Sequence, residues 1–439
     1  MAIARPLEHF PQWMHSDHVP ASNAGHGAPS TDSSFSAESR FGAEDSAASR
    51  ADSEDTSTCV SSEDLGDTNV LPLLRVSDDS GLFEEGAQAS WYLMLMGYVG
   101  KGYSGFQKSQ IPGDFETIEG NLLSAMKKIG VSSSEIEKAG TNMSSRTDKG
   151  VHAANLFYQF KTRPLRDEDK FINALNHSLS SQGDHAVRVF NIVNAKDLGL
   201  RPDFDVKASD LCQSRSYWYL VPSFAMAPVP SHATTCDTSM RKHMRSFRMS
   251  QKQLADVEEL LNRFLGEHCF SAFTAREKVQ YYKQRKFGTS AQVYTVQCSI
   301  KEQFGVEFLQ VQFVASRYLY HQIRNMMGFA LLVFHGRLDR DSNFNAVFEG
   351  GALPSKVEIP LAPAEPLLLL RPTFRDNIPA GSILNQMLEN KQSEAFLHNT
   401  ILPHVCRASV EPIVHFMTSL LQSTVRWLGR QHSVTGTKA

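Results

Sequence analysis

The sequence predicts an α+β protein in which a mainly antiparallel sheet is covered by helices on one face. Several short segments alternate apolar and polar residues, as strands do. Two of these segments are joined by Phe304-Gly305, which is typical of a hairpin turn. The order strand, helix, strand, helix occurs in the first half of the globular region, and a similar set recurs in the second half. Hairpin-paired strands with helices favour this class over a doubly wound parallel sheet.

In the first half, a strand is predicted over 91–98 and a helix near 117–129, ended by Gly130. A second strand covers 153–162 and a second helix 169–179. The residues that we expect on the inner faces of the first helix and the second strand are Ile118, Leu122, Met126 and Ile129, and Ala154, Leu156, Tyr158 and Phe160.

In the second half, Ser250 and Gln253 form a capping box for a helix that runs past Phe264 and is stopped by Gly266. Strands follow over 294–300 and 306–313, and a helix over 318–334 closes this half. Segments 393–405 and 410–429 have helical patterns, and we expect them to serve as scaffold. The inward set of the strand 294–300 is predicted to be Tyr294, Val296, Cys298 and Ile300.

Charge is unevenly distributed along the 439 residues. Residues 1–90 hold 16 acidic residues, four arginines and no lysine, whereas 91–439 hold 40 basic and 31 acidic residues. The first segment is also rich in Ser, Ala and Gly, which predicts a disordered acidic tail. The basic body suits a polyanionic partner such as nucleic acid, although an ordinary soluble surface is the alternative at this point.

Targeting and cysteine patterns are weak. The six cysteines are scattered without a C-x-x-C pair, which favours a reducing compartment and no structural zinc. No apolar run approaches the roughly 20 residues that span a bilayer. Arg5 stands alone before Arg40, with acidic residues between them, unlike a mitochondrial presequence. We expect a nuclear or cytoplasmic protein, with mitochondrion and plastid left open.

A glycine motif, Gly100-x-Gly102-x-x-Gly105, follows the first predicted strand, as a dinucleotide-binding loop would. That fingerprint requires a helix immediately after the glycines, because the pyrophosphate sits on the helix N-terminus. The next helical pattern starts only near residue 117, after a loop punctuated by Pro112 and Gly113. The sequence therefore argues against an NAD enzyme.

The segment "SSRTDKGVHAANLFYQF", 144–160, places Arg146 and Asp148 in a small polar loop before a strand. On its own, an R-x-D loop is usually a surface ion pair. Together with "GYVGKGYSGFQ", "RSYWYLVPSF", "YLYHQIRNMMG" and "IPLAPAEPLLL", in this order and spacing, it resembles the TruA family of tRNA pseudouridine synthases, and most of all its eukaryotic branch. The resemblance covers about 91–374 and, more loosely, the helical tail.

The resemblance implies an isomerase that detaches uracil from ribose and rejoins it through C5, without metal, redox cofactor or ATP. It implies Asp148 as the nucleophile or base, Arg324 as its cationic partner, Tyr217 as a stacking ring, Arg146 as the residue that enters the vacated place in the RNA, and Leu367 on the far side of the pocket. Ser145 departs from the family, where many members have Gly or Ala. Tyr219 is assigned to the core, and Arg215, His152, His321 and Asn325 are left open between structure and phosphate contact.

The resemblance also implies two ferredoxin-like half-domains, 91–211 and 212–374, around a central RNA-binding cleft, followed by a helical extension, 375–439. The expected partner is tRNA, with other structured RNAs left open, and a monomer is favoured. Two basic clusters, 241–248 and 278–286, mix cations with aromatics and suit phosphate contact and base stacking, or are solvated loops. The competing function is a catalytically silent RNA-binding or tRNA-chaperoning relative.

Overall fold

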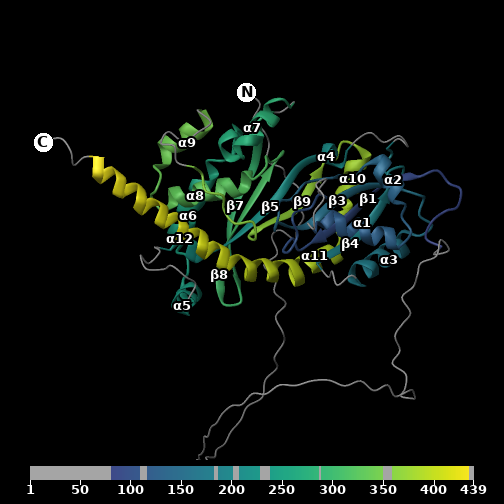
Figure 1. The fold of residues 1–439 in the computed structure, drawn as a ribbon, viewed down its shortest axis with the longest axis horizontal. Helices are drawn as coiled ribbons and strands as arrows, with labels where there is room; N and C mark the ends of the chain where they lie inside the picture. Colours follow the sequence, from purple (N-terminus) through teal and green to yellow (C-terminus); the bar gives the residue numbers. More distant parts are fainter. Residues whose placement is uncertain are drawn as a thin grey trace, which may run out of the picture. The chain divides into compact units, whose positions relative to one another are not determined.

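The structure is a computed structural model that describes residues 81–108, 116–181, 186–200, 207–227, 238–285, 288–349 and 358–434 (Figure 1). The acidic segment predicted to be disordered lies outside the described residues as far as residue 80. Residues 72–439 form one compact unit, the body, apart from 1–71. The fold and the candidate site described below belong to the body.

Nine strands make up the sheet of the body. They are β1 (Ser90–Tyr98), β2 (Asn142–Met143), β3 (His152–Thr162), β4 (Val187–Asn194), β5 (Cys212–Pro222), β6 (Gly266–Cys269), β7 (Ser290–Gln303), β8 (Val306–Ala315) and β9 (Leu367–Phe374).

The helices of the described residues alternate with these strands and then end the chain. They are α1 (Ile118–Lys128), α2 (Ser133–Ala139), α3 (Glu168–Ser181), α4 (Ala208–Leu211), α5 (Thr238–Ser246), α6 (Gln251–Asn262), α7 (Arg276–Lys283), α8 (Gln322–Phe334), α9 (Arg340–Glu349), α10 (Pro379–Met387), α11 (Lys391–Phe396) and α12 (Leu402–Val434), with a π-helical turn, Leu397–Ile401, between the last two.

The strand order is β4-β1-β3-β9-β5-β8-β7-β6, and β2 pairs with β3. Among the described strands, β3 and β9 pair in parallel through His152–Leu368 and Ala153–Leu369, and the other pairs are antiparallel. The sheet is therefore mixed but mostly antiparallel, as predicted for the α+β class. The strand β9, which sequence analysis did not predict, joins the N-terminal and C-terminal sets of strands into one sheet.

Helices cover both faces of this sheet, so the prediction of helices on one face is wrong. On β1, Met94 and Met96 belong to the main core, which contains apolar side chains of α1, α3, α6 and α8. Leu93 and Leu95 pack in a second cluster with Leu384 of α10. The C-terminal helices supply this second layer, because alternate strand residues are apolar on both faces and both must be buried.

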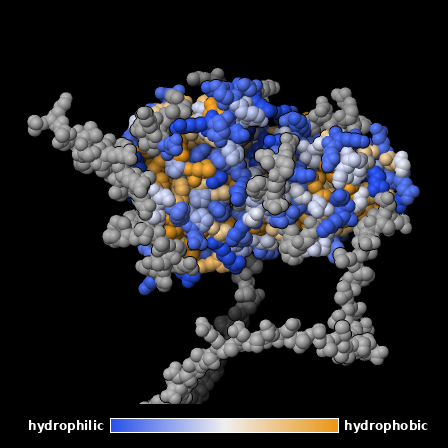
Figure 2. All heavy atoms as spheres, viewed as in Figure 1, coloured by the Kyte–Doolittle hydropathy of each residue, from blue (hydrophilic) through white to orange (hydrophobic). Residues whose placement is uncertain are grey.

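The opposite face of β9 is covered by α12 and the π-helical turn before it. Leu368 and Leu370 pack there with Ile401 and Val405, while Leu367 and Leu369 point into the main core. The segments predicted as two helices, 393–405 and 410–429, instead run through the π-helical turn into one long helix, α12, with Pro412 inside it. Figure 2 shows hydrophilic residues over most of the visible surface, with hydrophobic residues exposed in patches.

Two predicted helix starts are confirmed by their caps. Thr117 Oγ1 accepts a hydrogen bond from the Gly120 amide at 3.0 Å at the start of α1. Ser250 and Gln253 form both bonds of the capping box of α6. However, α6 ends at Asn262 rather than near Gly266, and Phe264 is buried just beyond it.

Two predicted strand faces are partly wrong, because bulges shift the alternation. In β7 the register shifts between Val293 and Thr295, and Tyr294 is 44% exposed rather than inward. Opposite β3 the register of β1 shifts between Met96 and Tyr98, and Ala153 rather than Ala154 shares the main core with Leu156. The alternation of apolar and polar residues in such a segment does not reveal a bulge.

The prediction that the disordered tail runs to residue 90 is wrong for its last residues. Leu82 and Phe83 are each 7% exposed, and Phe83 forms an isolated bridge with Leu165. The guanidinium of Arg163 lies 4.5 Å from the centre of the Phe83 ring, and the Phe171 ring centre is 6.2 Å away. Burial of this apolar pair stabilises the start of the body before β1.

Candidate active site

The loop 144–151, between β2 and β3, is held by hydrogen bonds along its length. The Ser144 amide donates to the Phe157 carbonyl at 2.9 Å, and the Phe157 amide donates to Ser144 Oγ at 3.0 Å. Thr147 Oγ1 lies 2.7 Å from the Tyr98 hydroxyl, and the Val151 amide donates to the Asp148 carbonyl at 3.1 Å. These bonds fix the backbone that presents Asp148.

The glycine-rich bend packs directly beneath this loop. A Cβ on Gly100 would lie 2.0 Å from the Val151 carbonyl oxygen, so only glycine fits there. Gly105 has φ +118° and lies against Thr147, Asp148 and Lys149. The glycines thus allow two backbone segments to approach each other beside Asp148.

The amides at the start of α1 also exclude the dinucleotide interpretation. The Ile118 and Glu119 amides donate to the Gly105 and Phe106 carbonyls at 3.2 and 2.9 Å, and the Gly120 amide donates to Thr117. A pyrophosphate would need these donors free. The glycine bend binds the first two of these amides, and the Thr117 side chain binds the third.

We expect Gly100→Ala to lower the free energy of unfolding by about 2–3 kcal/mol, because its methyl group would collide with a backbone oxygen that cannot rotate away. Gly102→Ala is the matched control: Gly102 has φ +91° but nothing near its Cβ position, so the loss should be about 1 kcal/mol. Urea unfolding of both variants measures the difference. Equal losses would show that the packing of Gly100 against Val151 is unimportant.

Asp148 and Arg324 form the central pair of the site. Arg324 Nη1 lies 3.8 Å from Asp148 Oδ2, and the two side chains are 13% and 21% exposed. Burial raises the pKa of Asp148, while the positive charge of Arg324 acts in the opposite direction and does not fully offset it. Arg324 Nε donates to the Ala362 carbonyl at 2.7 Å, which fixes the guanidinium toward the carboxylate.

Arg324 reaches Asp148 because α8 begins later than predicted. The helix starts at Gln322 rather than 318, after His321 in the left-handed region at φ +65°. Gln322 Oε1 accepts from the Leu319 amide at 2.8 Å, which closes the preceding turn. Arg324 is therefore in the first helical turn, and a long side chain there points back toward the N-terminal end.

His321 is a second neighbour of the carboxylate. Its Nε2 lies 3.7 Å from Asp148 Oδ2, and its ring stacks on Tyr320 with centres 3.7 Å apart. Burial and the charge of Arg324 lower the pKa of His321 to about 4. The imidazole is therefore neutral near pH 7, and Arg324 supplies the positive charge beside Asp148.

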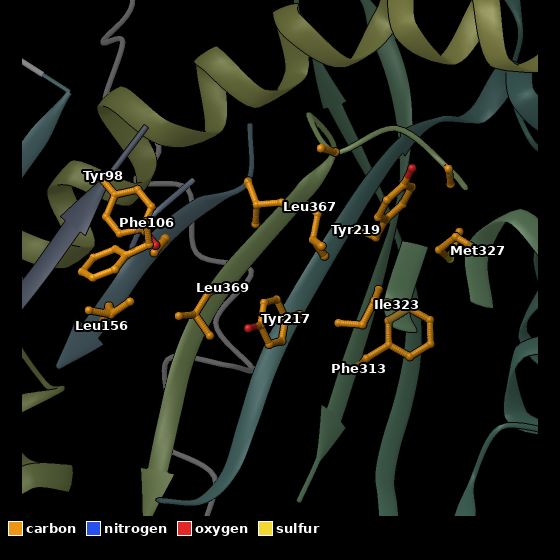
Figure 3. Packing of buried hydrophobic residues seen from close by; sticks show 14 of the residues in the cluster. Tyr98, Phe106, Leu156, Tyr217, Tyr219, Phe313, Ile323, Met327, Leu367 and Leu369 are labelled. Atoms are coloured by element: carbon orange, nitrogen blue, oxygen red, sulfur yellow. The ribbon is translucent and has the colours of Figure 1, made fainter. Parts of the chain in front are cut away.

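Tyr217 comes from β5 and is 5% exposed. Its hydroxyl lies 2.7 Å from Ser145 Oγ, and its ring meets the Tyr318 ring edge-on with centres 5.1 Å apart. Burial raises the pKa of this hydroxyl to about 12. Figure 3 shows Tyr217 between Leu369 of β9 and Ile323 of α8, with Leu367 farther along β9.

One cavity of about 620 Å³ is lined by all five residues predicted for the site. Arg146 is exposed, whereas Tyr217 and Leu367 lie on the walls. Pockets of a few hundred Å³ hold drug-sized ligands, so this one has room for a nucleotide. The structure thus brings together the five predicted site residues, Asp148, Arg146, Tyr217, Arg324 and Leu367. Their individual roles stay predictions.

Three residues left open by the sequence have structural contacts. Arg215 donates to the carbonyls of Ser144, Ser209 and Ser316 at 2.7–3.2 Å. His152 is fully buried, and its Nδ1 accepts from the Gly100 amide at 3.0 Å. Asn325 donates to the Phe273 carbonyl at 2.9 Å. Each of them binds backbone atoms, and two partners of Arg215, Ser144 and Ser209, line the cavity.

The two basic clusters differ in position. Arg248 of the first cluster pairs with Glu302 near the β7–β8 turn, at 3.3 Å, and no described residue of 241–248 lines the cavity. Tyr281 and Arg285 of the second cluster line it. Arg241 and Lys286 lack described side chains. Sequence analysis did not place the second cluster at this cavity, and its role in RNA binding stays a prediction.

Within the part of the chain that the structure describes, no group of three or more His, Cys, Asp or Glu side chains is arranged to hold a metal ion. Over the same residues, no helix combines the length and hydrophobicity needed to cross a membrane.

Comparison with known proteins gives consistent matches. A sequence model of a family described as tRNA pseudouridine synthase matches residues 260–375. Pseudouridylate synthase 1 homologs of Mus musculus and Homo sapiens are 28% and 29% identical over 71% and 64% of this chain, which span 69% and 60% of those proteins.

A bacterial relative extends the similarity beyond eukaryotes. The tRNA pseudouridine synthase A of Nitrosomonas eutropha is 26% identical over 56% of this chain and 74% of its own length. The stretch matched by the family model, 260–375, contains Arg324 and Leu367. On these findings the chain is similar to tRNA pseudouridine synthases of the TruA family, which are isomerases.

Proposed function

We propose that this protein converts uridines of tRNA to pseudouridine and that Asp148 acts on a uridine flipped into the cavity. The observation that carries the proposal is a partly buried carboxylate and guanidinium, Asp148 and Arg324, facing each other in a cavity of about 620 Å³ that Tyr217 lines. A lone surface ion pair would have neither the burial nor the cavity. Other structured RNAs are further candidate substrates.

The target base must leave its stack to reach Asp148, because the carboxylate lines a cavity rather than an open surface. Tyr217 offers a ring to the extruded base, and its hydrogen bond to Ser145 and contact with Tyr318 hold that ring in place. Leu367 closes another wall. Arg146, exposed at the cavity, is placed to enter the gap that the base leaves in the RNA.

In the reaction, the bond from ribose C1′ to uracil N1 breaks, the uracil turns, and C1′ bonds to C5. The hydrogen on C5 leaves as a proton and N1 gains one, so atoms and electrons balance without a redox partner. Asp148 in its ionised form either attacks the sugar as a nucleophile or removes a sugar proton. Both routes need the carboxylate, not the carboxylic acid.

Arg324 keeps enough Asp148 ionised for this chemistry. Burial alone favours the neutral acid, and phosphates of a bound RNA would favour it further. The guanidinium opposes both effects from 3.8 Å, and its hydrogen bond to Ala362 prevents it from swinging toward the RNA. Arg324 is therefore the cationic partner in the proposed mechanism.

The proposed architecture is two ferredoxin-like halves, 91–211 and 212–374, with the RNA-binding cleft at their junction and 375–439 as a helical extension. Strand orders support this. Both β4-β1-β3-β2 and β9-β5-β8-β7 have the order of a β-α-β-β-α-β unit with its fourth strand beside its first. The junction is the parallel β3–β9 pair, and Asp148 precedes β3.

The test is release of label from tRNA that carries tritium at C5 of uridine. The protein alone should release tritium to water without added metal, nucleotide or redox cofactor, because C5 loses its hydrogen when it bonds to ribose. A catalytically silent RNA-binding relative would bind the tRNA and release no label. No release from any of several tRNAs and structured RNAs would overturn the proposed activity.

A further inference from the structure

The helix α7 carries two adjacent tyrosines, although none of its residues is buried. Tyr282 has a clear structural contact: its hydroxyl accepts from the Tyr320 amide at 2.9 Å, and the Arg317 guanidinium lies 5.8 Å from its ring centre. Tyr281 makes no hydrogen bond to another described side chain or amide. It is 46% exposed, which is unusual for so large an apolar ring.

The ring of Tyr281 is held from two sides. The Arg285 guanidinium lies 4.3 Å from its centre, and the Tyr282 ring meets it edge-on at 5.4 Å. Because Tyr282 is bonded to the segment that precedes α8, Tyr281 is positioned relative to His321 and Arg324 rather than loosely attached. A tyrosine whose ring is fixed and yet exposed presents a flat apolar surface to solvent.

This surface is part of the cavity that holds Asp148. Tyr281 and Arg285 both line it, together with Tyr320, which is 39% exposed and has Lys278 5.9 Å from its ring centre. Exposed aromatic rings next to cations favour single-stranded nucleic acid, since bases stack on the rings and phosphates pair with the cations. The same surface suits an acidic protein less well, because it offers stacking area as well as charge.

We propose that Tyr281 and Arg285 form a stacking platform for the nucleobase next to the uridine that enters the cavity, with Arg285 also contacting its phosphate. The inference rests on the proposed function for the identity of the RNA. When a base is flipped out, its neighbour loses a stacking partner. A tyrosine ring at the mouth of the cavity can replace that partner and hold the strand open.

The chain offers a matched control. Tyr294 on β7 is 44% exposed, close to Tyr281, but it does not line the cavity. Tyr281→Ala removes the ring from a helix that has no buried residues, and alanine is the best helix former, so α7 should persist. Tyr281→Phe keeps the ring and removes only the hydroxyl. Comparison of Tyr281→Ala with Tyr281→Phe and with Tyr294→Ala therefore separates loss of base stacking at the cavity from the general effect of removing an exposed tyrosine.

The experiment measures binding of a tRNA transcript, and KM and kcat for tritium release, for the wild type and the three variants. Base stacking on an aromatic ring corresponds to a loss of roughly 5- to 100-fold in affinity on alanine substitution. We expect that loss for Tyr281→Ala, seen in KM more than in kcat, and near-wild-type values for Tyr281→Phe and Tyr294→Ala. Wild-type affinity and KM for Tyr281→Ala would overturn the platform.

A second readout does not depend on turnover. The same transcript, substituted with 4-thiouridine and irradiated on the protein, should crosslink to the peptide 279–283, and this crosslink should disappear in Tyr281→Ala. Crosslinks confined to other peptides would overturn the platform. If the wild type releases no tritium but the binding loss and the crosslink are found, the platform stands and the proposed activity fails.

Discussion

Asp148→Asn is expected to abolish tritium release, with a fall in kcat of at least about 10³-fold, while tRNA binding is kept. The amide has the size and most of the hydrogen-bonding shape of the carboxylate, but it cannot act as an anionic nucleophile or base. The loop should not move, because its hydrogen bonds come from Ser144, Thr147 and backbone atoms rather than from the Asp148 carboxylate. Removing a negative charge from an RNA site should leave affinity equal or slightly tighter.

The matched control is Asp210→Asn, the same chemical change in an exposed residue that lines the same cavity. It removes the same charge, so any general electrostatic effect on tRNA binding appears in both variants. We expect turnover of Asp210→Asn to stay near the wild type. Release of label by Asp148→Asn at the wild-type rate would refute the catalytic role of Asp148 but not the similarity to tRNA pseudouridine synthases.

The sequence predicted the fold class because alternation and helix caps are local signals. It missed β9, whose residues "LLLLRPTF" do not alternate at their start. Leu367 and Leu369 pack in the main core, and Leu368 and Leu370 pack under α12, so both faces require apolar side chains. A strand buried on both faces cannot be distinguished by periodicity from other apolar runs.

The second layer of helices was missed for a related reason. The predicted one-sided sheet requires polar residues at alternate positions of the strands. In β1, however, "WYLMLM" is apolar throughout, and the structure buries both sets of side chains. That run is the signal that would have predicted helices on both faces.

The candidate site was predictable from the family motifs, since the structure brings their residues into one cavity. Sequence analysis did not place Tyr281 and Arg285 at the cavity. They are far from Asp148 in the sequence, and only tertiary contacts bring them close to it. Tyr282 holds α7 to the segment before α8, and the left-handed residue His321 then ends that segment. Sequence patterns predict neither a hydrogen bond between distant segments of the chain nor a positive φ in a histidine.

The second large effect is expected at Arg324. Arg324→Gln should lower kcat/KM by about 10²-fold or more, because the carboxylate loses the charge that opposes its burial. Arg324→Lys keeps the charge but not the planar guanidinium, whose Nε donates to Ala362 while Nη1 faces Asp148, so it should recover only part of the rate. The difference in kcat/KM between Arg324→Lys and Arg324→Gln measures the contribution of the positive charge. The difference between the wild type and Arg324→Lys measures the contribution of the guanidinium geometry.

The pH profile gives a readout that a merely structural role of Arg324 would not move. In the wild type, burial raises the pKa of Asp148 and Arg324 lowers it, so activity should fall as the pH drops through that raised pKa. In the wild type, His321 is neutral until near pH 4, and the neighbouring Tyr217 hydroxyl is neutral below about pH 12. Loss of Arg324 removes one cause of the low pKa of His321, but burial, the larger cause, remains and still favours the neutral imidazole.

Without the cation, the pKa of Asp148 rises further. The acid limb of kcat/KM should therefore move to higher pH in Arg324→Gln and stay near the wild-type position in Arg324→Lys. Profiles measured by tritium release, with urea unfolding of each variant to check that it is folded, decide between the two roles. An acid limb in Arg324→Gln that coincides with the wild type would show that Arg324 does not act through the ionisation of Asp148.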